Sequence, residues 1–465
     1  MVRHTYNSGI SLISIPFDYS ADSTTQQGNA CLVFGLDTTS PPKSVFDFLT
    51  WVVGSYYAYD SRFPEMPAGR SKVAQGYFLY SAEVPLSVYA TDAVVGREVL
   101  KDPQGQPFEI DLFAGWNMIG DPFHGGNTTH SVSWYGDAVR VLRGDGAVLS
   151  VRDAIAARVI KAGLWSYVGG RYELSYTVDE WKGYWVKAYE ACRLLISRRE
   201  ASRSRADGGV PGLTGRSVNW SQRLVARAGA SASDAIDLGV AADATDGCDP
   251  LRDIEKPPAM AAVPYVYLSF PHPDWNENAG AYGVDVRSAT GRKTWEFTAA
   301  SNVRDADIVL TWPKIGDLPK DVSLTLVDEE TGVRRSMRTS SGYQFRMASG
   351  TAVRRFRVEA GVAAQGVLRV SGLTAGPGRG GSRTITCSLS SGGSVDVTVT
   401  PAAGGRPVRR IARGLTRAAG LAQFVWDGRD EGGARVPSGV YLCEVRATGE
   451  DGQVAKAVTV LTVAR

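Results

Sequence analysis

Hydrophobic and polar residues alternate over short stretches along most of the chain, and one such pattern occurs twice. Residues Ile10–Phe17 read ISLISIPF, and residues Trp116–Phe123, 106 positions later, read WNMIGDPF. Alternation predicts a strand with one buried face, and the proline that follows cannot donate to a sheet. A similar closing strand comes next, with Gly76 60 residues after the first proline and Gly183 61 after the second. This spacing predicts duplication of a whole folding unit.

A helix is predicted inside each copy. In VRDAIAARVI, residues 151–160, apolar side chains recur at the spacing of one helix face, and Ser150 is a candidate N-cap. Ser44 of SVFDFLTWV stands 28 residues after its proline, as Ser150 does. The match predicts that residues 44–52 form the corresponding helix. The glycine before the closing aromatic residues is expected to leave room for a large ring to pack.

Two further β-rich units are predicted. Eight alternating segments between residues 217 and 365 indicate a β-sandwich or jelly roll: VNWSQRLVARA, YVYLSF, YGVDVRSA, KTWEFTA, DIVLTW, VSLTLVDEE, YQFRMA and VRRFRVEA. The last 85 or so residues supply six or seven short strands, the rhythm of an immunoglobulin-like sandwich. Two runs rich in glycine, serine or arginine, at 197–216 and 374–382, read as a solvated linker and a tether.

The patterns together predict a mainly β chain. Its parts are two duplicated small β-rich units each with a short helix, a β-sandwich or jelly-roll unit, and a C-terminal immunoglobulin-like sandwich. The expected boundaries are residues 1–100, 101–197, 217–372 and 373–465, with a linker at 198–216. Each unit is expected to pack a core of its own.

Composition narrows the function classes. Of 465 residues, 43% are hydrophobic and 21% charged, which is typical of ordinary globular proteins. The net charge is +3 and the basic residues are spread out except for one cluster at 198–205, so nucleic-acid binding is not expected. No apolar run approaches the roughly 18 residues of a membrane span. The start does not resemble a secretory signal, so a secreted chain is expected to be truncated or processed at Met1.

Catalytic motifs are missing from the sequence. It contains no GxSxG, HExxH, Walker or kinase signature. The acidic pairs Glu329/Glu330 and Asp430/Glu431 fall in predicted hairpin turns, where acids are common, so they do not indicate a glycosidase dyad. We therefore expect a protein that is not an enzyme.

The segment WDGRDEGGARVPSGVYLCEV, which starts at Trp426, resembles the strand–turn–strand signature of the FlgD-type immunoglobulin-like domain. The resemblance implies that Trp426 and Tyr441 pack in the core and that Asp427-Gly428 makes the turn between them. Similar terminal domains act as sorting signals for export and surface attachment in type IX secretion. The two GWN/GYW-type repeats also resemble modules that accompany such domains in large secreted proteins. The resemblance thus implies an extracellular or cell-surface location.

Two cysteines fall within this last unit. Cys387 and Cys443 lie 56 residues apart with Trp426 between them, which resembles the Cys–Trp–Cys arrangement of immunoglobulin sandwiches. The resemblance implies a core disulfide. The alternative is a pair of buried free thiols.

Two groups of residues are candidate metal ligands. Asp243, Asp246, Asp249 and Asp253 crowd into one turn-rich stretch, where carboxylates can hold a calcium ion. They miss the EF-hand spacing, and the alternative is that they cap turns. His124 and His130 flank a polar loop but have no third ligand near them in sequence, so a metal site there is a weaker candidate. No other cofactor is expected.

Aromatic residues are the remaining candidates for binding. Stacked sugar rings could use exposed rings in either copy, and the alternative is that these rings fill the cores. In the second copy they are Trp165, Tyr167, Tyr172 and Tyr176, and in the first they are Tyr56, Tyr57 and Tyr59.

The sequence favours a non-enzymatic extracellular structural, adhesive or surface-display protein whose C-terminal domain serves attachment, sorting or assembly. The alternative is the carbohydrate-binding accessory region of a larger secreted hydrolase. Expected partners are other surface or extracellular proteins, further copies of the chain, or a polysaccharide.

Overall fold

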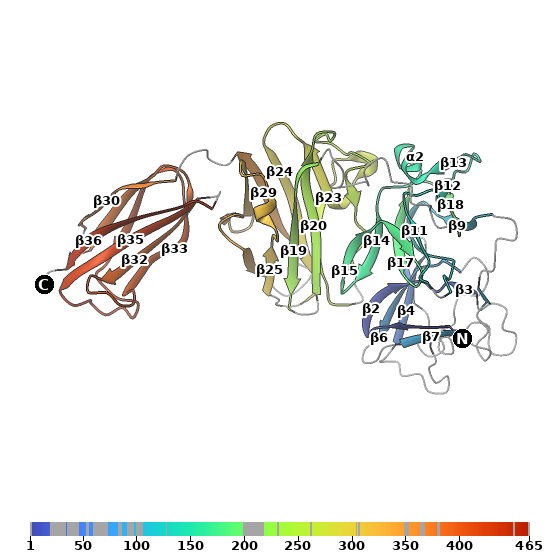
Figure 1. Ribbon diagram of the computed structural model, residues 1–465, viewed down its shortest axis with the longest axis horizontal. Coiled ribbons are helices and arrows are strands. Elements are labelled where there is room, and N and C mark those ends of the chain that lie inside the picture. Colours follow the sequence, from blue (N-terminus) through green and yellow to red (C-terminus); the bar gives the residue numbers. More distant parts are fainter. Residues whose placement is uncertain are drawn as a thin grey trace.

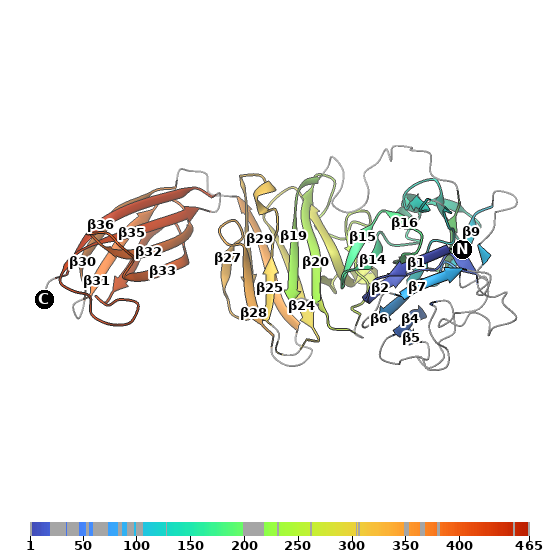
Figure 2. The same cartoon turned by 60° about the horizontal axis from the view of Figure 1, so that its bottom comes forward.

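The chain forms an elongated array of β-sheets, with the N-terminal units at one end and the terminal sandwich at the other (Figures 1 and 2). The computed structural model describes residues 2–18, 34, 46–52, 55–58, 73–81, 86–90, 97–98, 106–126, 128–198, 218–229, 232–260, 263–303, 305, 307–347, 353–362, 368–378, 382–449 and 452–463. The mainly β fold class is confirmed. We call β1–β8 the first unit, β9–β18 the second, β19–β29 the third and β30–β36 the terminal domain.

The first unit is built on a four-stranded sheet with the order β2-β6-β4-β5. Its strands are β2 (Gly9–Ile13), β6 (Tyr77–Ser81), β4 (Phe46–Val52) and β5 (Ser55–Ala58); β1 (Val2–Tyr6) pairs with β7 (Leu86–Ala90), and β3 (Phe17–Asp18) with β8 (Arg97–Glu98). The helix predicted for residues 44–52 is therefore wrong over its described part, 46–52. This segment is rich in aromatic and β-branched residues, and it has a strand partner on both sides.

The second unit has a sheet with the order β10-β17-β14-β15 and a second sheet, β13-β12-β18-β9. The bounds are β9 (Phe108–Leu112), β10 (Gly115–Gly120), β11 (Ser131–Ser133), β12 (Val139–Leu142), β13 (Val148–Ser150), β14 (Leu164–Val168), β15 (Arg171–Ser175), β16 (Thr177–Asp179), β17 (Gly183–Ala188) and β18 (Cys192–Ile196), with β11 paired to β16.

The predicted helix of the second unit is present as α2 (Val151–Ala156). The Ser150 hydroxyl accepts from the backbone N–H of Asp153 at 3.1 Å, as an N-cap does. The helix is shorter than predicted because Arg158 turns left-handed, with φ at 55°, and this ends the helical run.

The first two units share a strand order and face each other in a two-fold-like way. Ile13 forms a bridge with Lys182, and Ile119, its counterpart in the second unit, forms one with Gln75. A Cβ on Gly183 would lie 2.5 Å from the Ile13 carbonyl oxygen, and one on Gly76 would lie 2.9 Å from that of Ile119. These glycines are needed for close backbone contact between units, which differs from the expected role of making room for a ring.

The third unit is a sandwich whose strands run in the order β27-β26-β29-β24-β22-β23-β20-β19-β25-β28, with β21 also paired to β23. The bounds are β19 (Val218–Ala228), β20 (Ala232–Ala241), β21 (Ile254–Glu255), β22 (Val266–His272), β23 (Gly280–Ser288), β24 (Lys293–Ser301), β25 (Asp307–Thr311), β26 (Val322–Asp328), β27 (Arg334–Ser336), β28 (Gly342–Arg346) and β29 (Val353–Val362), with short 3-10 turns η2 (Asn276–Asn278) and η3 (Ile315–Asp317). All eight predicted strands are present, and β20, β21 and β27 are additional.

The second and third units share one hydrophobic core. Val284 and Ile254 of the third unit belong to the same buried cluster as Trp165 and Tyr184 of the second. The Trp165 indole also donates to the Glu255 carbonyl oxygen at 2.8 Å. This continuity differs from the expectation that every unit packs a core of its own.

The terminal domain is a two-sheet sandwich with its own core. Its sheets are β30-β31-β34 and β33-β32-β35-β36, with the bounds β30 (Val370–Pro377), β31 (Arg383–Leu389), β32 (Gly393–Pro401), β33 (Arg409–Arg417), β34 (Gly420–Trp426), β35 (Gly439–Gly449) and β36 (Val454–Val463). Residues 374–377 of the predicted tether are part of β30, because this segment pairs with β31. The linker predicted at 198–216 lies outside the described residues except for Arg198.

Candidate functional site

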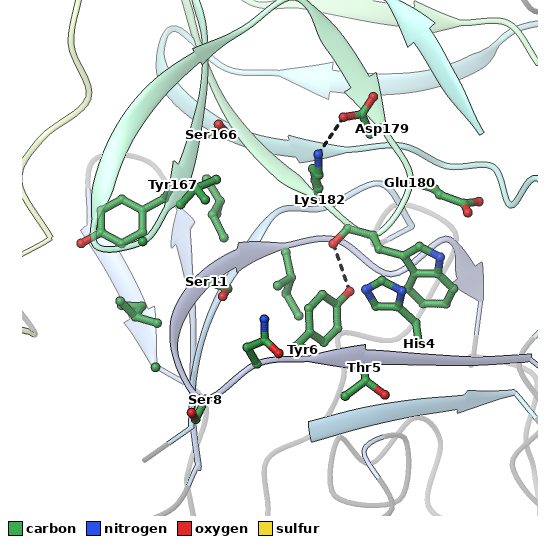
Figure 3. Close-up of a pocket in the computed structure, with 18 of the residues that line it drawn as sticks. His4, Thr5, Tyr6, Ser8, Ser11, Ser166, Tyr167, Asp179, Glu180 and Lys182 are labelled. Carbon is green, nitrogen blue, oxygen red and sulfur yellow. Dashed lines mark hydrogen bonds and ion pairs between the residues drawn. The ribbon is translucent and has the colours of Figure 1, made fainter. Parts of the chain in front are cut away.

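A groove of about 1530 Å³ lies where the first two units meet (Figure 3). We call it the inter-unit groove. One wall is the β1–β2 hairpin, residues 3–13, and the other is the turn at 179–182 together with the β14–β15 hairpin of the second unit. The two-fold-like contact between the units thus positions the site, because it holds β2 against the strand that follows Trp181.

Trp181 anchors one end of this groove. Its φ is 68°, a left-handed value that bulky residues rarely take, and Ala74 has φ 63° at the corresponding position of the first unit. The His4 ring stacks on the Trp181 ring at 4.6 Å, and the Tyr6 hydroxyl donates to the Trp181 carbonyl at 3.0 Å. Contacts made across the two units therefore hold the strained residue in place.

Charged groups at the groove are paired within the protein. Lys182 donates to Asp179 at 3.0 Å, and the buried Glu180 accepts from the Gly125 N–H at 2.7 Å and contacts His124 at 3.1 Å. Burial lowers the pKa of His4, which favours its neutral form beside Trp181. The groove therefore presents mainly neutral polar groups and the edges of rings.

The chemistry of the groove is that of a binding site. Its hydroxyl groups come from residues such as Thr5, Ser8, Ser11 and Ser166. Within the described part of the chain, none of them bonds to a histidine, so no nucleophile–base pair is formed. The arrangement can bind a neutral ligand and offers no group prepared to attack one.

The two candidate metal-binding histidines lie near this groove and have carboxylate partners. His130 contacts Asp121 at 2.5 Å, while His124 contacts Glu180. Burial opposes the charged form of His130, but the bond to Asp121 outweighs it and raises the pKa of His130. Among the residues described, no group of three or more ligating side chains is placed to hold a metal ion.

The four candidate calcium ligands do not converge. Asp243 pairs with Arg252 at 2.7 Å, and Asp246 pairs with Lys293 at 2.7 Å. Asp249 and Asp253 accept backbone N–H bonds within the turn and from the neighbouring strand. These partners match the alternative in which the acids cap turns.

The candidate sugar-stacking rings of the second unit lie mostly in the core. Trp165 and Tyr172 are each 3% exposed, and Tyr172 donates to the Pro258 carbonyl at 2.8 Å. Tyr167, 5% exposed, lines the groove with its edge while Phe78 and Tyr172 pack against it. The structure therefore covers the faces that a sugar ring would need.

The other aromatic candidates are placed differently. Tyr176 is 38% exposed, away from the groove residues. Tyr56 and Tyr57 lie in β5, where only the backbone is described, and Tyr59 lies outside the described residues. Sequence reasoning missed His4 and Trp181; the signal for Trp181 was a large ring just before the repeated Gly-aromatic pair.

Cys387 and Cys443 are free thiols, completely buried on facing sheets of the terminal domain. The implied disulfide is not formed in this structure, which matches the alternative of two buried thiols. The motif around them has the implied geometry, because the Trp426 ring is 1% exposed and packs against Tyr441 at 5.7 Å. The Trp426 indole donates to the Arg429 carbonyl at 2.9 Å, and Gly428 turns left-handed with φ 74°.

No described helix is long and apolar enough to cross a membrane.

Comparison with known proteins gives one family and several distant structures. No curated protein sequence matches the chain. The chain is similar to a two-domain fibronectin type III segment of chicken tenascin, with 16% identity over 35% of this chain and 95% of that one. It is also similar to a tetra-tandem repeat from the extending region of a large adhesion protein, with 12% identity over 79% and 98%. A GH2 β-galacturonidase from Eisenbergiella tayi shares 9% identity over 38% and 36%, and all three TM-scores are 0.15, so none carries an argument.

The family match covers one end of the chain. Residues 378–451 match the model of the FlgD Ig-like domain. This range includes β31–β35 and the Trp426 turn described above. The C-terminal sandwich is a FlgD Ig-like domain.

Proposed function

We propose that this chain is a non-enzymatic structural, adhesive or surface-display protein that works outside the cell or at its surface. The observation that carries the proposal is the FlgD Ig-like domain, with its own core, at one end of an elongated array of β-sheets (Figure 1). In this arrangement the terminal domain serves attachment, sorting or assembly, and the first three units are displayed away from it. Partners are other surface proteins or further copies of the chain.

The experiment is to follow where the chain goes in the producing cell. The full chain is compared with a version that ends at residue 372, using surface labelling and fractionation. We expect the full chain at the surface or in the medium, and the shortened chain to lose attachment or export. Equal distribution of both would contradict a sorting or attachment role, and turnover of a substrate by the purified chain would contradict the non-enzymatic role.

A second candidate function rests on the inter-unit groove, whose neutral polar lining suits a carbohydrate. Ser11→Trp would fill the groove, and Ser371→Trp, on exposed β30, is the matched control. If the chain is a carbohydrate-binding region, it binds insoluble polysaccharide, Ser11→Trp loses the binding and Ser371→Trp keeps it. Absence of binding by the unaltered chain would remove this candidate and leave the first one.

A further inference from the structure

A lysine and an aspartate meet in the core of the third unit, where solvent does not reach them. The Lys256 side chain is 0% exposed and that of Asp234 is 2% exposed. The Lys256 Nζ lies 2.5 Å from Oδ2 of Asp234, and it also donates to the carbonyl oxygens of Ala235 at 3.0 Å and Leu268 at 3.1 Å. The two residues lie 22 positions apart in the sequence.

The two oxygens of Asp234 have unequal surroundings. Oδ2 accepts from Lys256 and from the Leu268 N–H at 2.7 Å. Oδ1 is buried without a hydrogen-bond partner. A bare oxygen on a buried carboxylate is costly. Burial raises the pKa of Asp234 and lowers the pKa of Lys256, so both shifts favour a neutral acid beside a neutral amine.

We propose that Lys256 and Asp234 condense into an amide bond that cross-links the third unit. A proton passes from the ammonium to the carboxylate, and the neutral Nζ then attacks the carboxyl carbon. The new C–N bond forms as the bond from that carbon to Oδ1 breaks. Oδ1 leaves as water with the acid proton and one amine proton, so no oxidant or other reactant is needed.

The product satisfies the groups that the ion pair leaves unequal. Oδ2 becomes the amide carbonyl and keeps the Leu268 N–H, while the new N–H can donate to Ala235 or Leu268. A hollow of about 10 Å³ is lined by Asp234 and Tyr267, which is roughly the room that one water molecule requires. The leaving oxygen is thus the one without a partner, and a space for water lies beside it.

A neighbouring pair provides an internal contrast. Lys161 lies 2.5 Å from Oε2 of Glu255, but Lys187 binds Oε1 of the same carboxylate at 2.5 Å. Both oxygens of Glu255 therefore have a cationic partner, and this carboxylate stays charged. The structure assigns one cross-link to the chain and none to Glu255.

The test is the intact mass of the unfolded full chain. We expect a mass lower than that of the sequence by one water molecule, also in Lys161→Met, but not in Lys256→Met or Asp234→Ala. Cyclisation at an Asp-Gly step also removes one water, but that deficit would persist in Lys256→Met. A wild-type mass equal to that of its sequence, or a deficit that Lys256→Met retains, would overturn the proposal.

Peptide mapping locates the bond. Cleavage after both arginine and glutamate separates residues 228–252 from 256–277 and releases 253–255. The cross-link predicts one branched product that joins the first two fragments without the third. Recovery of the two as separate peptides would overturn it, whatever becomes of the proposed function.

Discussion

The closest test of the two-fold-like contact is to add one methyl group to Gly183. In the structure, that Cβ would lie 2.5 Å from the oxygen, 2.9 Å from the carbon and 3.0 Å from the nitrogen of Ile13. All three are backbone atoms, so no side chain can rotate out of the way. Gly183→Ala must therefore push β2 away from β17 and weaken the bridge between Ile13 and Lys182.

The magnitude follows from the distances. Overpacking in a well-packed interior costs about 1–3 kcal/mol, and contact with fixed backbone at 2.5 Å belongs at the upper end, about 2–3 kcal/mol. Gly76→Ala is the reciprocal change, with the nearest atom of Ile119 at 2.9 Å, and we expect about 1–2 kcal/mol. Gly144→Ala is the matched control because open space surrounds its Cβ position. It should be neutral or stabilise by about 0.4–1 kcal/mol.

The assay is urea unfolding of the full chain followed by tryptophan fluorescence. We expect the midpoint of the first three units to fall in the order Gly144, Gly76, Gly183, while the terminal domain keeps its own transition. If Gly183→Ala is no less stable than Gly144→Ala, the close contact between the units does not exist in solution. A loss equally large in Gly144→Ala would show that the effect is not local.

Three further predictions concern separate parts of the chain. Trp426→Ala removes a ring that is 1% exposed, so the terminal domain should lose about 3–5 kcal/mol in calorimetry while the other transition stays. Burial acts to raise the pKa of Asp328, but hydrogen bonds led by that from Arg354 outweigh it and lower that pKa. Its contribution to stability is then present above the unfolded value of about 4 and lost as the pH falls through the folded one, so Asp328→Asn should flatten the urea midpoint between about pH 3 and 6. Burial raises the pKa of Cys387, and that of Cys443 to about 12, so maleimide should label neither thiol until the domain unfolds; continued protection without reductant would indicate a disulfide.

The sequence allowed prediction of most strands because period-two alternation is a local signal. It failed where a coincidence looked like a signal: Ser44 and Ser150 share a spacing, yet residues 46–52 form β4, which occupies the position of β14 in the equivalent sheet. It also missed β20, whose sequence ASDAIDLGVA has few aromatic or β-branched residues and depends on its partners β19 and β23.

The site was harder to predict because its walls come from distant segments. Tyr6 and Trp181 lie 175 residues apart, and no spacing rule connects them. The pair of Lys256 and Asp234 is equally silent, because each alone reads as an ordinary surface charge. Only Gly76 and Gly183 marked the contact between units in the sequence, and their repeated position was recognised before its purpose.

The geometry of this contact also bears on why the unit occurs twice. In a linear repeat array each unit contacts the next head to tail, so units can be added without limit. Here the end of β2 bridges the segment before β17, and the end of β10 bridges the segment before β6. Such a reciprocal contact uses the same surface on both partners and closes on itself. A third copy would find that surface already occupied, so the duplication builds a closed pair, and the groove between its halves belongs to neither unit alone.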